Sequence, residues 1–449
     1  MLPKNLQYQP KVESAPARRY RTNIQPQSGS SFNAGETIII NIPTRNNTAL
    51  IASESCLKFA FNVTTAASTV VSAFESCGLH GAFSRLRVFH GSNLLQDIQN
   101  YSELAKILHD MQMPLDAVQG RFSITNATTN EYTGALVGVT AGDPVAVKPI
   151  NRGRNLSSGT VAGIGAAART VYGSINLISL VGSLAGGKYL PLWEMTSAPL
   201  RLELVVCSSV QAAMCISPAP TAFTLSNVEY VGEFLELPDS AIAAIRAGSS
   251  NPLQMVVPDF RAYTFSQGVT SGTATTISMP IPAKFSSLKS IFVNSKLFQP
   301  TTGYYPYSSG QLGLTQYQFR IGSEVLPSNP PTTNAEFFNE AAKCFGSIAD
   351  IDYQPAVDLD SYALDTPVIT NTYTLGMTAN SGSFVVGIDC EAYQNADKSS
   401  IFAGMNTNTS DIFYIPQYVP TATGTIYLTA FSNFDSVLVC ENGVAYARY

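Results

Sequence analysis

The chain has 449 residues, more than one ordinary hydrophobic core organises, which predicts two domains of about 200 residues each. Only 13% of the residues are charged and the net charge is −5, which selects no partner. Low charge together with many Thr, Ser, Asn, Gly and aromatic residues predicts β structure. It also predicts a surface that is largely not meant to face water, because soluble monomers use charge to stay apart.

Residues 1–33 have the features of a flexible arm. They include four Pro and little hydrophobic periodicity, which argues against packed structure. The basic residues of this arm, set against one acidic residue, are Lys4, Lys11, Arg18, Arg19 and Arg21. Two interpretations stay open: a solvated tail, or an arm that contacts nucleic acid, an acidic membrane face or a neighbouring subunit.

Neither a secretion signal nor a membrane span is expected. The N-terminal residues have no apolar segment of the kind a signal peptide needs, and no apolar run approaches the roughly 18 residues of a membrane span. The seven Cys include no CxxC pair, and several lie in strand-like runs. We therefore expect buried, reduced thiols and synthesis in a cytosol.

Residues 34–238 predict a first β domain. In residues 57–63 and 200–206, large apolar side chains occupy every second position, as in strands with one buried face. One helix is predicted at residues 100–111, where apolar residues recur at helical spacing and Asn100 and Glu103 have capping-box spacing. Residues 112–172, rich in Thr, Asn, Gly and Ala, predict a long loop insertion.

A linker helix is predicted over residues 239–252, with its helical part ending at Gly248. Residues 253–449 then predict a second β domain with several further stretches of period-two alternation. A hairpin closes the chain, and Asn442-Gly443 suits its tight two-residue turn.

The two halves share an order of features. Each runs from an Arg through an apolar strand and a Gly-Ser turn, at residues 91–92 and 322–323, to one amphipathic helix. The second helix has capping-box spacing at Thr333 and Glu336. Two copies are too few for a solenoid, and a parallel α/β fold would need a helix between most strands. The pattern predicts an all-β chain with a few short helices, built as two similar sandwiches, and such strand-rich units fit jelly rolls.

The stretch "SLVGSLAGGKYLPL" has the GxxxxGK spacing of a phosphate-binding P-loop, with Gly182, Gly187 and Lys188 in the motif positions. A P-loop needs Ser or Thr after the Lys to hold magnesium and a helix that begins at the Lys. Here Tyr189 follows, and Pro191 comes soon after. The stretch is therefore interpreted as a flexible hairpin loop.

No other motif predicts catalysis, a cofactor or a metal. The only histidines are His80, His90 and His109, and none lies in a protease, hydrolase or zinc motif. Four Asp in residues 350–360 lack the Gly and terminal Glu of a calcium loop and predict a solvated loop or a weak cation site. We expect a protein that is not an enzyme, binds no cofactor and packs against copies of itself.

Five segments give the chain a family resemblance. They are "SRLRVFHGSNLLQDIQNYSELAKILHD", "KYLPLWEM" and "SNVEYVGEFLELPDSAI" in the first half, and "YQFRIGSEVLPSNPP" and "FVVGIDCEAY" in the second. In pattern and order they resemble the double jelly-roll major capsid proteins of the tectivirus–adenovirus lineage, closest in character to those of polinton-like viruses. The resemblance covers about residues 35–449.

This resemblance implies two eight-stranded jelly rolls that stand perpendicular to a shell. Three chains would form a homotrimeric, pseudo-hexameric capsomer, and the capsomers would tile an icosahedral virion capsid around the viral genome. Further partners implied are penton or minor capsid proteins. Loops at residues 112–172 and 300–312 would lie on the outer crown or between subunits. The arm at residues 1–33 would contact neighbours, an internal membrane or the genome.

Two other interpretations remain. A capsid protein of a single jelly-roll lineage with a projecting domain would show jelly-roll strand order in only one half. A carbohydrate-binding β-sandwich, such as a virion spike or lectin, would show surface aromatic residues over a cleft. Trp193 is the only Trp, and its apolar surroundings in the sequence predict core packing instead.

Overall fold

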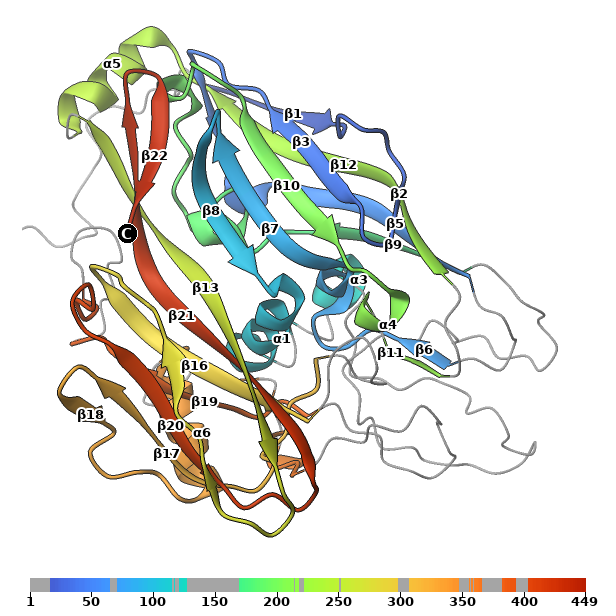
Figure 1. Cartoon of the computed structure of the whole chain (residues 1–449). Coiled ribbons are helices and arrows are strands. Elements are labelled where there is room, and N and C mark those ends of the chain that lie inside the picture. The colour runs from blue at the N-terminus through green and yellow to red at the C-terminus, as the bar shows by residue number, and fades with distance from the viewer. Residues whose placement is uncertain are drawn as a thin grey trace, which may run out of the picture.

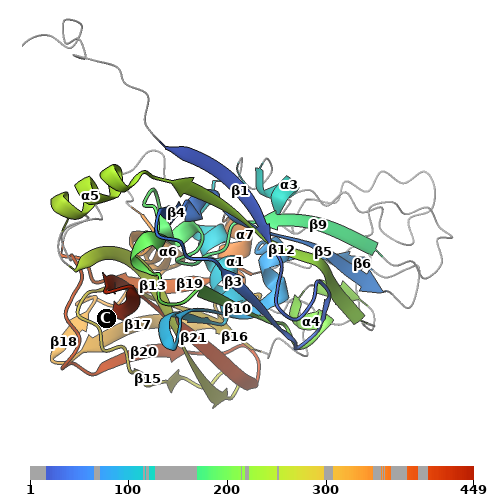
Figure 2. The same cartoon turned by 90° about the horizontal axis from the view of Figure 1, so that it is seen from above.

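The computed structural model describes residues 17–64, 71–114, 117, 121–126, 169–213, 215–217, 222–249, 252–297, 307–346, 355, 357, 359–365, 382–392 and 403–449. Its regular structure is dominated by antiparallel strands, as the alternation in the sequence predicts. The strands of the two halves of the chain form two bodies that lie side by side (Figure 1), as the view from above also shows (Figure 2).

The first body is a jelly roll. Its strands are β1 (Arg18–Ile24), β2 (Phe32–Asn33), β3 (Thr37–Ile42), β4 (Thr48–Leu50), β5 (Cys56–Thr64), β6 (Val71–Ala73), β7 (Phe83–His90), β8 (Asn93–Gln99), β9 (Arg169–Ile175), β10 (Leu200–Val206), β11 (Cys215–Ser217) and β12 (Ala222–Glu236). One sheet has the order β1-β12-β5-β9 and the other β3-β10-β7-β8. Counting the eight main strands along the chain, these orders are 1-8-3-6 and 2-7-4-5, the arrangement of a jelly roll.

The second body repeats this arrangement. Its strands are β13 (Leu253–Val269), β14 (Thr275–Thr276), β15 (Met279–Ile281), β16 (Leu288–Lys296), β17 (Leu314–Ile321), β18 (Glu324–Leu326), β19 (Val385–Asp389), β20 (Ile412–Tyr418), β21 (Gly424–Glu441) and β22 (Val444–Arg448). Its sheets are β13-β21-β16-β19 and β14-β20-β17-β18, with β15 also on β20. Counting β14 and β15 as one strand gives the same eight-strand order. A single jelly roll with a projecting domain is therefore excluded.

Period-two alternation explains why each sheet has one face buried against the other sheet. In β10, Leu200, Leu202 and Leu204 are fully buried, while the residues between them are partly exposed. Aromatic side chains fill the space between the sheets of each jelly roll. Phe61 stacks on Phe223 with ring centroids 5.0 Å apart in the first. Such pairs add to the stabilisation that burial alone supplies.

The helices and short 3-10 turns lie between strands. They are η2 (Ala52–Glu54), η3 (Gly78–Ala82), α1 (Tyr101–Gln112), α3 (Ser123–Thr125), η5 (Ser183–Ala185), η6 (Leu192–Glu194), α4 (Val210–Ala213), α5 (Asp239–Gly248), α6 (Asn334–Lys343) and α7 (Leu359–Tyr362). Helices α1 and α6 each follow a Gly-Ser turn between equivalent strands, β7–β8 and β17–β18, which confirms the internal repeat. Thr333 and Glu336 form the predicted capping box of α6. The capping box predicted for α1 is wrong, because Asn100 has a left-handed backbone (φ 50°) and makes no side-chain cap.

The N-terminal residues differ from the expectation of a flexible arm through residue 33. Residues 18–24 form β1, the first strand of the first jelly roll, which pairs with β12 from Arg18 opposite Glu236 onward. Tyr20 stacks on Phe234 with centroids 5.5 Å apart, and Arg19 pairs with Glu233 (3.1 Å) and Glu54. An edge strand with a largely exposed face has no strong alternation, which is why the sequence pattern missed it.

Each jelly roll has two distinct ends. Strands β1 and β5 run antiparallel to β12 and β9, so the connections β1–β3, β5–β7, β8–β9 and β10–β12 share one end, here called the loop end. The opposite end, here called the base, holds the start of β1, the β9–β10 connection and α5. The second jelly roll is aligned with the first, since Tyr307 of the β16–β17 connection donates its N–H to Glu75 before β7. The β21–β22 turn lies at the base, where Ser197 donates its N–H to Gly443.

Candidate functional site

The contact surface between the two jelly rolls holds several buried polar clusters. It is here called the seam. Helix α1 and strand β8 of the first jelly roll meet β13, β16 and β22 of the second there (Figure 1). Helix α1 was expected to bury one apolar stripe, and that stripe is buried. The polar side of α1 is buried as well, because the second jelly roll covers it.

Glu103 of α1 is the centre of one polar cluster in the seam. Its Oε1 lies 2.7 Å from the Lys296 Nζ of β16, and each side chain is only 4% exposed. Asn294 of the same strand donates its Nδ2 hydrogen to this oxygen at 2.7 Å. A carboxylate that would be costly to bury alone thus has both a counter-charge and a hydrogen-bond donor from the other jelly roll.

Lys106 and Asp110, one turn further along α1, form a second cluster. Their Nζ and Oδ2 atoms lie 2.7 Å apart and both side chains are buried. Lys106 also donates to the Gly382 carbonyl and the Ser383 hydroxyl, each at 3.0 Å. The Ser383 hydroxyl in turn donates to Asp110 at 2.7 Å. The ion pair on one helix is therefore completed by a backbone segment of the second jelly roll.

A third contact joins β8 to β13. Gln96 donates its Nε2 hydrogen to Asp259 Oδ1 at 2.9 Å, and its own Oε1 accepts from Ser179 and Leu180. Burial raises the pKa of Asp259 to about 7. The hydrogen bond from Gln96 favours the ionised carboxylate and offsets part of this rise. The carboxyl group therefore titrates near neutral pH inside the seam.

The C-terminal hairpin closes the seam at the base. His90 Nδ1 accepts the N–H of Ala445 at 3.0 Å, and Asn93 donates to the Ala445 carbonyl at 3.1 Å. The predicted turn is confirmed, because Asn442 and Gly443 both have left-handed backbones between β21 and β22. Strand β22 belongs to the second jelly roll by pairing and contacts the first by these two bonds.

The P-loop-like stretch proves to be a structural part of the same seam. It forms a loop with the 3-10 turn η5, and no helix begins at Lys188. Lys188 instead donates to the Val256 carbonyl of β13 at 3.2 Å. Gly182 is required for packing, since a Cβ there would meet the Leu177 carbonyl oxygen at 2.0 Å. The interpretation as a loop is confirmed, and the interpretation as a hairpin is not.

Two histidines lie in the core beside α1. His80 Nδ1 lies 2.8 Å from the Tyr101 hydroxyl, and His109 donates from Nδ1 to the Ser76 carbonyl at 3.1 Å. Burial lowers the pKa of both imidazoles, and for His80 the neighbouring His109 lowers it further. They are buried, hydrogen-bonded core residues and neutral at pH 7.

Nothing in the described ranges forms a reactive or metal-binding cluster. No three His, Cys, Asp or Glu side chains there are placed to share a metal ion. The thiols of six cysteines are free, namely Cys56, Cys77, Cys207, Cys344, Cys390 and Cys440. Burial raises the pKa of Cys77 and Cys207. Within the same ranges, no helix has the length and apolarity to cross a bilayer. Most of the Asp-containing stretch 350–360 lies outside the described residues.

Of the five basic residues proposed from sequence for partner contacts, three lie together on one described strand. Arg18, Arg19 and Arg21 lie on β1 at the base, with Arg19 engaged in its ion pairs. Lys4 and Lys11 lie outside the described residues. The seam residues were not predicted, because a stripe of charged side chains on a helix is normally solvated. The internal repeat was the one available hint, since two similar bodies in one chain must meet.

Strand order and seam together define a double jelly roll. The sequence matches no protein-family model and no curated protein. The fold is similar to PBCV-1 VP54, as fitted into a reconstruction of the virophage Sputnik (TM-score 0.61, 9% identity, 99% of this chain and 100% of that one). It is also similar to the mavirus major capsid protein (0.58, 11%, 100% and 93%) and the Faustovirus major capsid protein (0.55, 8%, 98% and 93%).

Proposed function

We propose that this protein is a viral major capsid protein, a non-enzymatic structural protein of the virion that assembles with copies of itself. The observation that carries the proposal is the double jelly roll itself: two bodies of identical strand order that lie side by side in the same orientation and are joined by a buried polar seam. Solved structures similar over nearly the whole chain are those of capsid proteins. Low charge fits this function, because a large permanent interface excludes charged side chains from its centre.

The assembly unit follows from the two-lobed shape. One chain presents two similar lobes, so three chains around a threefold axis present six, and the resulting trimer fills the lattice position of a hexamer. Trimers would then tile an icosahedral shell around the genome. Penton or minor capsid proteins would complete the shell at vertices. This arrangement requires that the lobes keep a fixed relation, which the seam supplies.

The two ends of the chain suggest an orientation in the shell. We place the loop end, where the connection between β8 and β9 leaves and rejoins the sheets, toward the outside. The base, which carries the exposed Arg18 and Arg21 and from which the segment with Lys4 and Lys11 departs, faces the interior. There the basic residues would contact the genome, an internal membrane or neighbouring capsomers.

The single Trp does not support the carbohydrate-binding alternative. Trp193 is 7% exposed and packs against Ala49 and Ile242, so it forms no aromatic platform for a sugar.

Light scattering after size exclusion tests the assembly unit. A trimer has a mass of 144 kDa, three times the 48.0 kDa of one chain. A monomer that stays stable on dilution would contradict the proposal, because its weakly charged surface would then have no covering partner. Electron microscopy of concentrated samples would next show whether the trimers tile into shells or sheets.

A further inference from the structure

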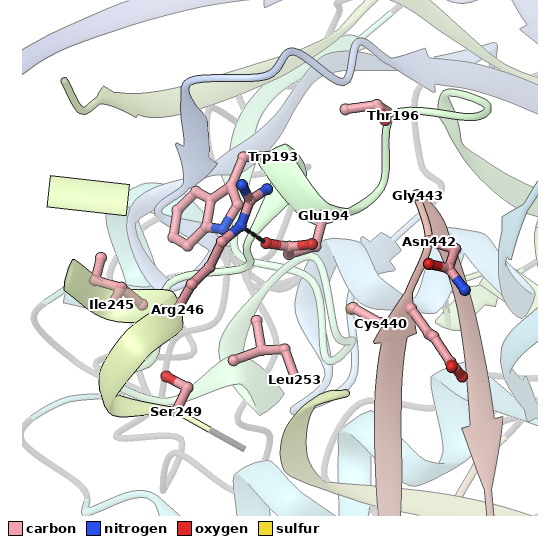
Figure 3. A pocket seen from close by; sticks show the side chains of 11 residues that line it. Trp193, Glu194, Thr196, Ile245, Arg246, Ser249, Leu253, Cys440, Asn442 and Gly443 are labelled. Atoms are coloured by element: carbon pink, nitrogen blue, oxygen red, sulfur yellow. Dashed lines mark hydrogen bonds and ion pairs between the residues drawn. The ribbon is translucent and has the colours of Figure 1, made fainter. Parts of the chain in front are cut away.

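A pocket of about 490 Å³ lies at the base, next to the hairpin turn that closes the seam. Four segments line it: the β9–β10 connection with Trp193, the C-terminal part of α5, the start of β13 at Leu253, and the β21–β22 turn (Figure 3). Arg246 of α5 crosses toward the indole of Trp193, and its Nε donates to Glu194 Oε1 at 2.6 Å. The pocket therefore has an aromatic and aliphatic wall beside an ion pair.

Two features show that this pocket lacks a partner within the described chain. The indole Nε1 of Trp193 is buried and has no hydrogen-bond acceptor there, which is a cost that a folded protein normally avoids. Ile245 lies on the pocket side of α5, and its side chain is 37% exposed. The one buried residue of this helix is Ile242. An apolar helix face and an unpaired donor thus meet at one place.

The described chain begins near the N-terminal end of α5, and the C-terminal part of the same helix lines the pocket. Arg18 pairs with Glu236, two residues before Pro238 caps α5. Helix α5 has ten residues and is about 15 Å long, whereas sixteen extended residues reach up to about 50 Å. The N-terminal segment, residues 1–16, can therefore reach the pocket of its own chain.

The composition of the segment suits the pocket. Its Pro residues disfavour a long helix and favour an extended strand that fits a groove. Its larger apolar side chains are Met1, Leu2, Leu6, Tyr8 and Val12. Two acidic residues, Glu194 and Glu441, line the pocket against one basic residue, and Lys4 and Lys11 are of the opposite charge.

We propose that residues 1–16 dock in the base pocket of their own chain, with an apolar side chain against Ile245 and Trp193 and a backbone carbonyl accepting the indole N–H. The docked segment ties β1 to α5 and to the C-terminal hairpin, three elements that end at the base. This inference does not depend on shell formation, and it assigns Lys4 and Lys11 to the base surface.

The single Trp makes the test direct, since Trp193 is the only one in the chain. We would compare the tryptophan emission of the full chain with that of a chain lacking residues 1–16, and then titrate a synthetic peptide of residues 1–16 into the shortened chain. Docking predicts a different emission maximum on truncation and a saturable return toward the full-length spectrum. A peptide of the same composition in scrambled order should have no effect.

Matched variants locate the binding site. In the shortened chain, Ile245→Asp should weaken peptide binding about tenfold or more, because it places a charge in the apolar wall. Val419→Asp, at a similarly exposed aliphatic side chain at the loop end, should leave binding unchanged. Identical emission of the full and shortened chains, or equal effects of the two variants, would overturn the proposal. An emission difference that disappears on dilution would overturn docking within one chain and identify a second copy as the source of the segment.

Discussion

Glu103 on α1 and Lys296 on β16 form an ion pair across the seam, with Oε1 and Nζ 2.7 Å apart and both side chains almost fully buried. Each residue comes from a different jelly roll, so neither charge is compensated until the two bodies dock. Breaking this pair leaves a buried charge, which costs far more than the pair contributes when intact.

Glu103→Gln should therefore destabilise the protein by about 3–5 kcal/mol. Lys296 would stay buried without its counter-charge, and denaturant unfolding followed by circular dichroism would measure the loss. Lys284→Gln, which removes the solvent-exposed pair with Asp411, is the control and should change little. Equal effects of the two variants would show that the seam pair is no more important than a surface pair.

Asp259 predicts a pH dependence of stability. Its pKa is about 7 in the fold and about 4 in an unfolded chain, so the folded state binds the proton more tightly. The stabilisation that proton binding to Asp259 gives the folded state is complete below about pH 4 and is lost as the pH rises through 7. Asp259→Asn cannot ionise, so the melting temperature of the variant relative to the wild type should increase from pH 4 to pH 8. A constant difference would mean that Asp259 is not the titrating group.

The buried histidines act in the opposite direction. Because the pKa of His80 is lowered by burial, its contribution is present above about pH 6.5 and is lost as the pH falls below that value. His80→Gln keeps a polar partner for Tyr101 but takes up no proton. Thermal melts should show a smaller loss of stability between pH 7 and pH 5 in the variant than in the wild type. Parallel curves would contradict a role for this imidazole.

The β21–β22 turn supplies a backbone prediction. Gly443 has φ +79°, and a Cβ there would meet the Thr196 hydroxyl at 3.1 Å. Gly443→Ala should destabilise the protein by about 1–2 kcal/mol, because an L-residue is strained in this conformation. Gly248→Ala at the end of α5 has open space around the new methyl group and should be neutral or stabilise by up to about 1 kcal/mol. Equal melting temperatures for the two variants would refute the assignment of strain.

The sequence predicted the features that local pattern determines. Period-two alternation identified strands such as β5 and β10, and the repeated Gly-Ser turn followed by a helix indicated two similar bodies. Jelly-roll order was expected from the family resemblance. In each of these cases the buried face or the turn is set by residues close together in the chain.

The sequence did not predict the features that distant segments determine. Strand β1 has little alternation because it lies at an edge, so its residues were assigned to a flexible arm. Glu103 was assigned to a helix cap, whereas it binds residues of β16 nearly two hundred positions away. The charged stripe of α1 has the same pattern as a solvated stripe, and only the presence of the second jelly roll distinguishes the two.

The hairpin strand β22 has a consequence for the order of events during synthesis. Residues Val444–Arg448 leave the ribosome after everything they contact, including His90 and Asn93 of the first jelly roll. The first jelly roll can complete its sheets long before these residues are synthesised. Its surface around His90 and Asn93 stays uncovered until translation has passed residue 448. A chain whose synthesis has not yet reached β22 therefore exposes a patch of the first jelly roll that β22 later covers.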